Sequence, residues 1–414
     1  MWKLPEGAMF VLNRLEERGF QAYVVGGCVR DTLLGRVPKD WDICTDALPP
    51  QLQRVFADCR VIETGLKHGT LTVLQGQEPY EVTTFRVDGE YTDHRHPDEV
   101  VFVSDVREDL SRRDFTVNAM AWSPSAGLVD AFGGQADLAA GVIRCVGDPS
   151  LRFGEDALRI MRALRFAAVY GFSIAPETDA AIHALKDTMG DVAAERIRVE
   201  LAKLLCGEGA GKILRDYGDV LTTLMPPLRT VDWARTVRGV EAVPPTEAFR
   251  LTMLLREIEA PRVKETLTGL KLDNATRDRV LTLVRHQDWP FRPERRGMLA
   301  CLSAFGEEVA RQLLIVRRAK EIALGRRPLE EINAESAALT AVLEDVLADG
   351  VCFTVKDMAV NGCDLMAMGM KGRAVGECLT YLLGLLVAEA IPNEREQLLD
   401  AARLHLKHSS GIHN

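Results

Sequence analysis

The chain has 414 residues, of which 47% are hydrophobic and 27% are charged, a composition typical of soluble folded proteins built from two to four units. No run reaches the ~18 apolar residues of a membrane-spanning helix, and the charged N-terminal segment does not fit a secretory signal, so we expect a cytoplasmic protein without membrane contact. The net charge of −9 excludes a wholly basic nucleic-acid binder but allows a local basic surface.

The first ~150 residues predict a mixed α/β unit, because short β-rich runs alternate with helical periods. The expected elements, in chain order, are a helix over 4–19, a strand over 23–25, a helix over 28–34, a strand from the acids before Ile43, and strands over 70–74, 80–85 and 100–103. Residues 86–99 are dense in charge and lack a period, so we expect a mobile loop there. From about residue 150, strand signals nearly vanish and helical spacing dominates.

Two carboxylates flank a tryptophan in the segment KDWD, where Asp40 and Asp42 lie one residue apart. In a strand, alternate side chains share a face, so both carboxylates would point the same way and Trp41 the other way. Neighbouring carboxylates repel each other unless a cation lies between them or one takes up a proton. The spacing by itself also fits an ordinary turn, because aspartate is common in turns.

Gly26 and Gly27 follow an expected strand and precede an expected helix, a place where backbone amides can approach a phosphate. Arg30, in the first turn, could reach the same phosphate, and Asp31 could orient that arginine or cap the helix. A phosphate cradle followed 13 residues later by a same-face acid pair suits nucleotidyl transfer with two Mg²⁺ ions. Glu81 is the candidate third carboxylate, with an ordinary exposed strand acid as the alternative.

Five motifs in order resemble one protein family: GGCVRD, KDWD, DLSRRDFTVNAMAW at 109–122, LVDAFGG at 128–134 and RFGEDALRIMRALRFA at 152–167. The resemblance is to the bacterial class II tRNA nucleotidyltransferases and poly(A) polymerases of the DNA polymerase beta superfamily, and it covers roughly residues 20–205. It implies that Asp40 and Asp42 bind the metal and that Gly27 and Arg30 hold the triphosphate.

The third and fourth motifs carry further implied roles. The resemblance implies that Arg113 contacts the nucleotide, whereas Arg112 serves either the phosphates or the fold. Asn118 would tie down a loop, and Asp130 would brace the junction between the catalytic and helical parts.

The segment GEDALRIMRALRF predicts a helix that begins near Gly154 and carries a stripe on one face, made of Asp156, Arg159, Arg162 and Arg165. A solvated, salt-bridged surface is the alternative reading of such a stripe. The resemblance makes it a base-reading helix, in which an aspartate accepts from the exocyclic amine of cytosine or adenine and an arginine donates to ring or carbonyl acceptors. Asp156 and Arg159 would read the base edge, and Arg162 and Arg165 would support them or contact sugar and phosphates. Uracil and guanine would be rejected, because they present a carbonyl where the acid requires a donor.

Three other features bear on function. The loop at 86–99, with Arg86, His94 and His96 among its polar residues, looks full length, which in the family argues against members that add only C. No neighbouring residue in the sequence completes a metal site with His94 and His96. The absence of a His-Asp dipeptide predicts no phosphohydrolase activity. Nine scattered cysteines without a Cys-x-x-Cys pair argue against disulfides or a zinc ribbon, so we expect most of them to be buried.

The expected fold class is α+β, with a nucleotidyltransferase head (mixed β-sheet with helices) followed by an all-α neck, body and tail. The expected divisions are the head at 1–150, the neck at 151–215, the body at 216–327 and a tRNA-binding tail at 328–414. In the tail, a small basic turn at 369–373 suits an RNA phosphate, or is a plain turn between helices.

The predicted function is template-independent addition of C, C and A to the tRNA 3′ end, with Mg²⁺ as cofactor, CTP and ATP as substrates and pyrophosphate as product. The alternatives are an A-only tRNA enzyme or poly(A) polymerase and, from another class, a non-catalytic RNA-binding relative. The sequence makes no prediction of oligomeric state.

Overall fold

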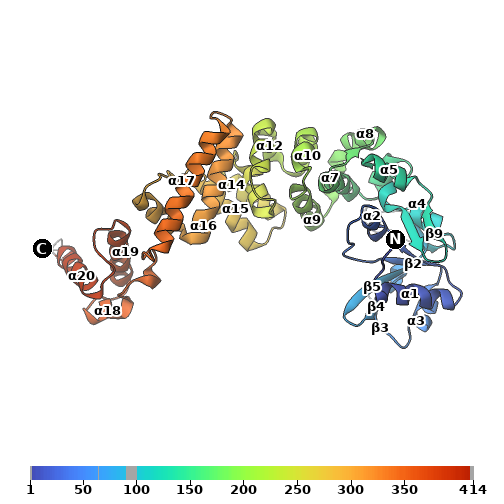
Figure 1. The fold of residues 1–414 in the computed structure, drawn as a ribbon, viewed down its shortest axis with the longest axis horizontal. Helices are drawn as coiled ribbons and strands as arrows, with labels where there is room; N and C mark the ends of the chain where they lie inside the picture. The colour runs from blue at the N-terminus through green and yellow to red at the C-terminus, as the bar shows by residue number, and fades with distance from the viewer. Residues whose placement is uncertain (1, 64, 90–99, 411–414) are drawn as a thin grey trace. The chain divides into compact units, whose positions relative to one another are not determined.

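The computed structural model describes residues 2–63, 65–89 and 100–410. The chain divides into two compact units, which are treated separately below (Figure 1). The first unit comprises Met1–Thr230 with Thr266–Leu272, and the second comprises Val231–Glu265 with Asp273–Asn414.

A seven-stranded mixed sheet forms the centre of the head, in the order β3-β4-β5-β2-β1-β8-β9. Its strands are β1 (Ala22–Val25), β2 (Ile43–Thr45), β3 (Arg60–Ile62), β4 (Thr70–Gln75), β5 (Glu78–Thr84), β8 (Met120–Ser123) and β9 (Gly127–Asp130). Only the β2–β5 pair in this sheet is parallel, and all its other pairs are antiparallel. The parallel pair matters for function, because it places the beginning of β2 beside the middle of β5.

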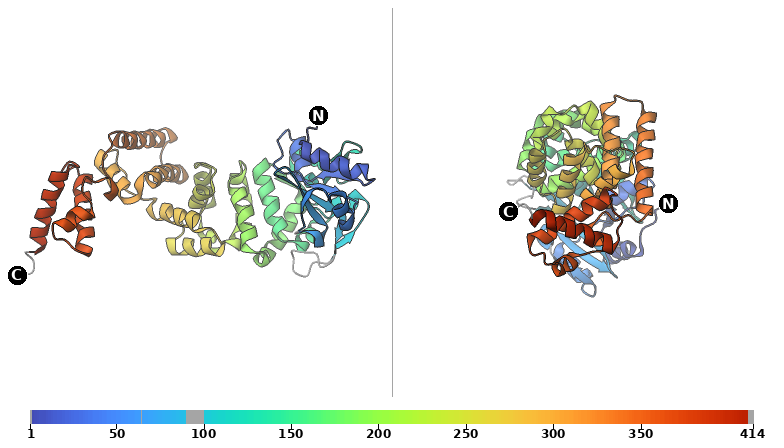
Figure 2. Two further views of the ribbon diagram at one scale, coloured as in Figure 1. Left: turned by 90° about the horizontal axis from the view of Figure 1, so that it is seen from below. Right: turned by 90° about the vertical axis from the view of Figure 1, so that its left-hand side faces the viewer.

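Five helices belong to the head, and the first four of them contact strands of this sheet (Figure 2). They are α1 (Glu6–Glu17), α2 (Gly27–Leu33), α3 (Pro49–Val55), α4 (Val106–Ser111) and α5 (Gly134–Ala140). Helix α1 buries Ala8, Val11, Leu12 and Leu15, the spacing of one helix face, and it contacts β1 and β5. The helices expected over 4–19 and 28–34 are therefore confirmed, the first shorter by two residues at each end and the second shifted by one residue.

The charged segment after β5 differs in part from the expected loop. Residues Arg86–Asp88 form a short strand, β6, which pairs with β7 (Val100–Phe102), so the first three residues of the expected loop are extended. The sequence showed no strand period here, because β6 and β7 have only three residues each, too few for an alternating pattern to be recognised. The rest of that loop, including His94 and His96, lies outside the described residues.

Helices dominate the first unit after the sheet: α6 (Pro149–Glu155), α7 (Leu158–Tyr170), α8 (Pro176–Leu185), α9 (Ala194–Leu205), α10 (Ala210–Asp216) and α11 (Gly218–Leu224). A two-residue pair, β10 (Val142–Ile143) with β11 (Ser173–Ile174), lies between them in the sequence. The predicted helix start near Gly154 was wrong, because Gly154 belongs to α6. Asp148 caps that earlier helix at Pro149, and the extended backbone of Asp156 (φ −147°, ψ 103°) separates it from α7.

The described residues of the second unit form helices and turns without a strand. The helices after residue 230 are α12 (Trp233–Glu241), α13 (Glu247–Leu255), α14 (Ala260–Gly269), α15 (Asn274–His286), α16 (Arg295–Leu324), α17 (Leu329–Ala348), α18 (Gly362–Ala367), α19 (Arg373–Val387) and α20 (Arg395–Ser410). The predicted α+β class is confirmed: a mixed sheet with helices is followed by an all-helical region. Six of the nine cysteines are buried, as expected, and no described helix is long and apolar enough to cross a membrane.

Candidate active site

The acid pair directly precedes β2 at the centre of the sheet. The backbone amide of Val25 in β1 donates to the Asp42 carbonyl oxygen at 2.9 Å, which fixes the approach to the strand. Trp41 is only 8% exposed, whereas Asp40 and Asp42 are both exposed. The alternation expected of a strand therefore holds across these three residues, although β2 itself begins at Ile43.

Glu81 lies beside the acid pair because of the parallel strand pairing. Ile43 of β2 pairs with Val82 of β5, so Asp42 and Glu81 occupy matching positions one residue earlier on adjacent strands. Although Asp42 is exposed, the protein atoms around its carboxyl remove part of its hydration and raise its pKa. The negative charges of Glu81 and Asp40 act in the same direction, and the positive charge of Arg113 opposes them.

This carboxylate group fits a divalent cation. Carboxylate oxygens are the ligands that hard divalent cations prefer. Loss of hydration is the main cause of the raised Asp42 pKa and the charges of Glu81 and Asp40 add to it, and a bound cation would offset both effects. Within the described residues, however, no three Asp, Glu, His or Cys side chains converge into a complete metal site. Two carboxylates with substrate oxygens are a sufficient ligand set for magnesium-like ions, which retain several water or phosphate ligands.

Gly26 brings Arg113 close to the start of α2. Its φ of +79° is in the left-handed region that favours glycine, and its backbone N–H donates to the Met120 carbonyl oxygen at 3.1 Å. A Cβ at Gly26 would lie 2.9 Å from Arg113 Nη1, so the guanidinium lies directly against the glycine. Gly27 is the first residue of α2, and a Cβ there would lie 3.6 Å from Arg30 Nη2.

Arg30 is buried and held on three sides. Its Nη1 donates to Asn118 Oδ1 at 2.5 Å, and its Nε donates to Asp31 Oδ1 at 2.9 Å. Its guanidinium carbon lies 5.1 Å from the ring centroid of Phe166 and 4.8 Å from that of Tyr170, both on α7. Of the two roles expected for Asp31, the structure shows the one in which it orients Arg30.

Asp109 of α4 holds both arginines of the SRRDF segment. Its carboxylate is fully buried and accepts from Arg112 Nη2 at 2.9 Å and from Arg113 Nη2 at 3.3 Å. Burial alone would raise the pKa of Asp109, but the charges of Arg113 and Arg112 outweigh it and lower the pKa. Arg112 thus has a contact that serves the fold, the second of the two roles expected for it.

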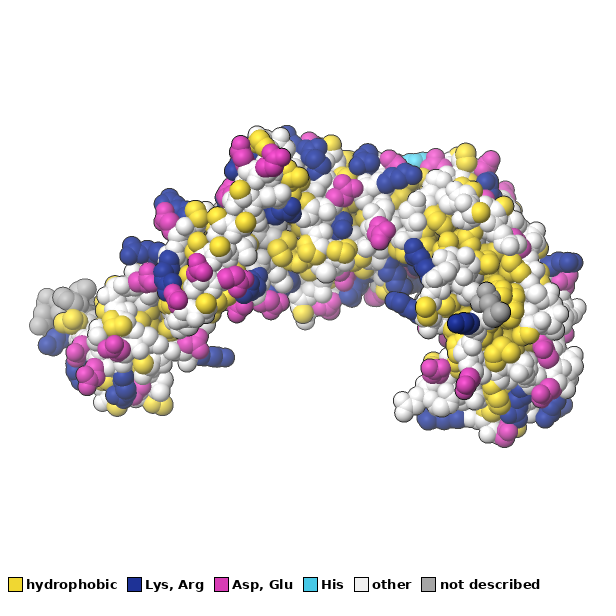
Figure 3. Space-filling view, in the orientation of Figure 1, with side chains coloured by type: hydrophobic (Ala, Val, Ile, Leu, Met, Phe, Trp, Pro, Cys, Tyr) yellow, Lys and Arg dark blue, Asp and Glu magenta, His cyan; other side chains and the backbone are white. Residues whose placement is uncertain are grey.

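The expected stripe of α7 is held by ion pairs to other segments. The four pairs, with their shortest distances, are Asp156–Arg196 at 2.7 Å, Arg159–Glu155 at 2.5 Å, Arg162–Asp114 at 2.6 Å and Arg165–Glu200 at 2.6 Å. None of the four stripe side chains is more than 34% exposed, so the salt bridges of the alternative reading are present but are largely shielded from water, and the base-reading role stays a prediction. Basic side chains gather on the surface beside α7 and α9 (Figure 3).

Asp114 is the most strongly perturbed carboxylate of this group. Burial opposes its ionisation, but the charge of Arg162 and the hydrogen bonds from Asn118 and Arg162 hold its pKa at about 2. Asn118 Nδ2 donates to Asp114 Oδ1 at 3.0 Å, and the backbone N–H of Phe115 donates to the same oxygen at 2.8 Å. Asp114 therefore stays ionised across the whole physiological range.

Comparisons with known proteins bear on the whole chain. Residues 22–144 match the family model "Poly A polymerase head domain", residues 171–219 match "Probable RNA and SrmB- binding site of polymerase A", and residues 245–402 match a model of tRNA nucleotidyltransferase domain 2. The CCA-adding enzyme of Limosilactobacillus fermentum is 34% identical over 97% of each chain, and that of Geobacillus kaustophilus is 35% identical over 97% of this chain and 98% of its own. The crystal structure of the Bacillus stearothermophilus CCA-adding enzyme in complex with CTP superposes with a TM-score of 0.77 at 31% identity, over 97% of this chain and 98% of that one.

The chain belongs to the class II CCA-adding enzyme family. It is accordingly a nucleotidyltransferase, and use of a divalent metal is general for the family. A Thermotoga maritima CCA-adding enzyme complexed with tRNA, at 23% identity and a TM-score of 0.65, shares the fold.

Several residues of this nucleotidyltransferase site were not singled out by the sequence. They are the partners that hold the expected arginines and aspartate: Asp109, Asp114, Glu155, Arg196 and Glu200. Asp109 could have been found, because Arg112 and Arg113 follow it by three and four residues, directly after α4 ends at Ser111. Arg196 and Glu200 carry no such signal, since their partners are about 40 residues away in the chain.

Two other features that the sequence singled out are Asp130 and the basic turn at 369–373. Asp130 accepts from the backbone amides of Gly134 and Gln135 at 2.7 and 2.9 Å, so its contacts are local to the start of α5 and do not brace a junction. In the tail turn, Gly372 has a φ of +56°, and the Arg373 side chain is 91% exposed while pairing with Glu377 at 2.7 Å.

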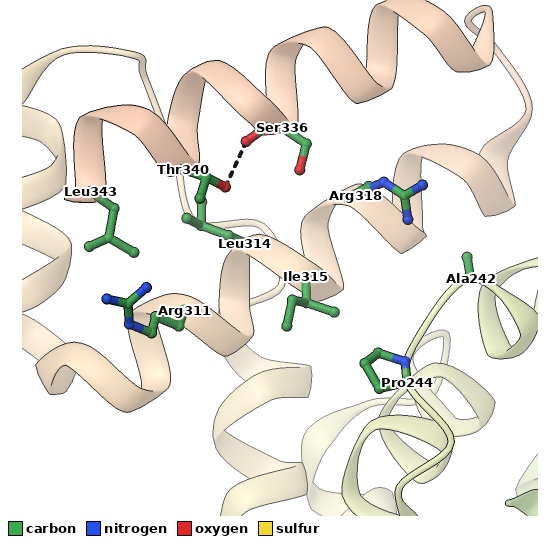
Figure 4. A pocket seen from close by; sticks show the side chains of 9 residues that line it. All are labelled: Ala242, Pro244, Arg311, Leu314, Ile315, Arg318, Ser336, Thr340 and Leu343. Carbon is green, nitrogen blue, oxygen red and sulfur yellow. Dashed lines mark hydrogen bonds between the residues drawn. The ribbon is translucent and has the colours of Figure 1, made fainter. Parts of the chain in front are cut away.

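A separate pocket of about 530 Å³ lies in the second unit, among α16, α17 and the connection between α12 and α13 (Figure 4). Its lining is mostly apolar, and its charged members are Arg311 and Arg318. Arg311 is already paired with Glu344 and with Glu307, the latter at 2.8 Å. No carboxylate lines this pocket, so it does not offer the metal-binding chemistry of the family.

Proposed function

We propose that this chain adds C, C and A to the 3′ end of tRNA from CTP and ATP without a nucleic-acid template, and releases pyrophosphate. The observation that carries the proposal is the acid pair before β2, where the charge of Arg113 opposes the rise in the Asp42 pKa, in the same unit as Arg30 and the arginine-lined helix α7. The relative crystallised with CTP supports this choice of substrate class, and the relative crystallised with tRNA has the same fold.

In the proposed reaction, the terminal hydroxyl of tRNA attacks the α-phosphate of the nucleotide and pyrophosphate leaves. Asp40 and Asp42 hold Mg²⁺, with Glu81 as a third acid beside them. Bound there, Mg²⁺ would lower the pKa of the attacking hydroxyl and neutralise the charge that develops on the phosphate. Arg30 and Arg113 hold the triphosphate beside Gly26 and Gly27, because guanidinium groups bind phosphate oxygens in pairs.

Base choice rests on Asp156 and Arg159. Asp156 Oδ1 accepts from the Leu158 amide at 3.1 Å and from Arg196 Nη1 at 3.3 Å, whereas its Oδ2 accepts only from Arg196 among the described residues, at 2.7 Å. A carboxylate oxygen accepts about two hydrogen bonds, so Oδ2 keeps one position for a base amine. Cytosine and adenine supply that donor, and uracil and guanine leave the acid facing a carbonyl. Arg162 and Arg165, held by ion pairs with Asp114 and Glu200, keep α7 in position behind Asp156 and Arg159.

The helical remainder is proposed to hold the RNA. We assign the neck to 151–215, the body to 216–327 and the tRNA-binding tail to 328–414, with the exposed basic turn at 369–373 as a phosphate contact. Since precursor tRNA is a cytoplasmic substrate in bacteria, we propose that the enzyme acts in the cytoplasm.

The test uses purified protein, Mg²⁺ and a tRNA transcript that ends at its discriminator base. CTP alone, ATP alone and both together are supplied, and product length is read on a sequencing gel. Two additions with CTP and three with both are expected. Extension by ATP alone, without CTP incorporation, would instead assign the chain to the A-only enzymes or poly(A) polymerases, and no extension at all would indicate a non-catalytic RNA-binding relative.

A further inference from the structure

Asn118 lies between the two ends of the proposed nucleotide site. It closes a single 3₁₀ turn, Thr116–Asn118, and is 6% exposed. Its Oδ1 accepts from Arg30 Nη1 at 2.5 Å, and its Nδ2 donates to Asp114 Oδ1 at 3.0 Å. Asp114 Oδ2 in turn accepts from Arg162 Nη2 at 2.6 Å and Nε at 2.8 Å. A buried chain of hydrogen bonds therefore joins the triphosphate arginine on α2 to the base-reading helix α7.

The chemistry of asparagine suits this position. One end of its amide accepts from a cation and the other end donates to an anion, so a neutral side chain satisfies both charged neighbours. An aspartate would face Asp114 with like charge, and a lysine would face Arg30 with like charge. Since Arg30 and Asp114 are nearly buried as well, losing the bridge leaves charged hydrogen-bonding groups that water cannot readily satisfy.

A second contact joins the same two elements. The Arg30 guanidinium lies over the rings of Phe166 and Tyr170, and the Tyr170 hydroxyl donates to Asp31 Oδ1 at 2.9 Å. The aromatic contact holds Arg30 against the C-terminal half of α7, whereas the asparagine bridge reaches Arg162 in its middle. Two attachments at different points fix both the position and the rotation of α7 relative to α2.

We propose that Asn118 is a positioning residue that couples base recognition on α7 to alignment of the triphosphate by Arg30. When the base fits Asp156 and Arg159, α7 keeps the position in which the Asn118 bridge aligns Arg30 with the triphosphate. When the base does not fit, α7 is displaced, and the bridge moves Arg30 out of that alignment. Discrimination then appears in the chemical step as well as in binding. The inference rests on the proposed function, because it requires a nucleotide bound across both elements.

The experiment measures kcat and KM for CTP and for UTP on a tRNA transcript, in the full-length protein and in Asn118→Leu. Leucine has a similar size but makes neither hydrogen bond. We expect the ratio of kcat/KM for CTP to that for UTP to fall about tenfold or more, because the variant loses two hydrogen bonds to charged groups. We expect the fall to come mainly from kcat for CTP, because the variant loses alignment while retaining the contacts to the base.

Thr116→Val is the matched control. Thr116 lies in the same turn and is equally buried, but its hydroxyl donates to Asp137 Oδ2 at 2.7 Å, on the α5 side. It should lower stability without changing the CTP to UTP ratio. If Asn118→Leu does not fold, Asn118→Ser takes its place, since the shorter side chain cannot span Arg30 and Asp114.

A double-mutant cycle adds an independent readout. Arg162→Met should cost less activity in an Asn118→Leu background than in the wild type, because both residues act through one bridge. An unchanged CTP to UTP ratio, or fully independent effects of the two substitutions, would overturn the coupling while leaving the proposed function intact. Failure of the wild type to incorporate any nucleotide would overturn the proposed function itself.

Discussion

At the scale of single residues, the site depends on how its charges are held. The exposed acids Asp40, Asp42 and Glu81 repel one another, while the buried acids Asp109 and Asp114 each neutralise arginines. Repulsion within the first group opposes folding unless a cation is bound, whereas the ion pairs of the second group favour folding. Substitutions in the two groups should therefore differ in whether they affect activity or folding.

Asp42→Asn should abolish nucleotide incorporation while leaving the protein folded. The substitution keeps the side-chain shape but removes a charge that the proposed metal requires, so we expect a loss of about a hundredfold or more in kcat. The melting temperature should not fall, because Asp42 is exposed and relieved of repulsion by the change. Glu17→Gln, at an exposed acid of α1, is the control, and retained activity in Asp42→Asn would remove the catalytic assignment.

Asp114→Asn should instead lower stability in a pH-dependent manner. The pKa of Asp114 is held at about 2, below its ordinary value of 3.8, so its contribution is full above pH ~4 and is lost as the pH falls toward 2. This shift corresponds to about 2 kcal/mol. Denaturant unfolding of wild type and variant at pH 7 and near pH 2 should show a difference at pH 7 that shrinks at low pH. A difference that does not vary with pH would contradict this account.

At the scale of elements, partners from neighbouring helices orient the proposed base-reading residues, Asp156 and Arg159. Arg196 of α9 makes both of its hydrogen bonds to Asp156, which lies with an extended backbone in the break between α6 and α7. The geometry of the proposed base edge is therefore set by the packing of α9 against α7.

Arg196→Met should loosen base choice in the same direction as Asp156→Ala. Removing the guanidinium frees Asp156 to rotate, so we expect UTP misincorporation relative to CTP to rise about tenfold. Arg198→Met, two residues along the same helix, is the control, because Arg198 donates to the Lys271 carbonyl oxygen and does not reach Asp156. Equal losses with all four nucleotides would count against a base-reading role for Asp156.

Gly26→Ala should weaken nucleotide binding through Arg113. The new Cβ would lie 2.9 Å from Arg113 Nη1. In addition, alanine is strained in the left-handed backbone conformation of this position, at φ +79°. Gly19→Ala separates these effects, because Gly19 has a φ of +82° with nothing within 4 Å of its Cβ position. Both variants should lose about 1 kcal/mol of stability, but only Gly26→Ala should raise KM for CTP and ATP. Equal KM values in the two variants would show that Arg113 does not need that contact.

At the scale of the whole molecule, the proposed chemistry lies entirely in the first unit, while the second unit is proposed to hold RNA. All eleven candidate site residues lie between Gly26 and Arg165. Binding of the tRNA body should therefore be separable from the reaction at its end.

Charge reversal in the tail tests this separation. Lys371→Glu with Arg373→Glu should raise KM for tRNA without changing kcat. The slope of log binding constant against log salt concentration should become shallower by about 0.7–0.9 for each phosphate contact that is lost. Arg403→Glu is the control, since Arg403 is also exposed and paired within its own helix, with Asp400 at 2.6 Å. An unchanged KM in the double variant would reduce the turn at 369–373 to a plain connection between helices.

The order of elements and the motif residues could be predicted from the sequence, because both depend on local pattern. Alternation around Trp41 predicted that Asp40 and Asp42 share a face, and helical spacing predicted α1 to within two residues at each end. The start near Gly154 was wrong for a local reason too, since Asp148 and Pro149 begin an earlier helix that contains Gly154. The fourfold division of the chain stays a prediction.

Only the tertiary structure decided which charges meet. Asp156 pairs with Arg196 at 40 residues' separation, and Arg162 pairs with Asp114 at 48, although acids nearer in sequence were available to each arginine. Pairing of this kind depends on how α7 packs against α9 and the head, and that packing is set by apolar burial, which carries no information about individual charges. The sequence by itself determined which chemistry the chain carries, and folding determined which groups hold it in place.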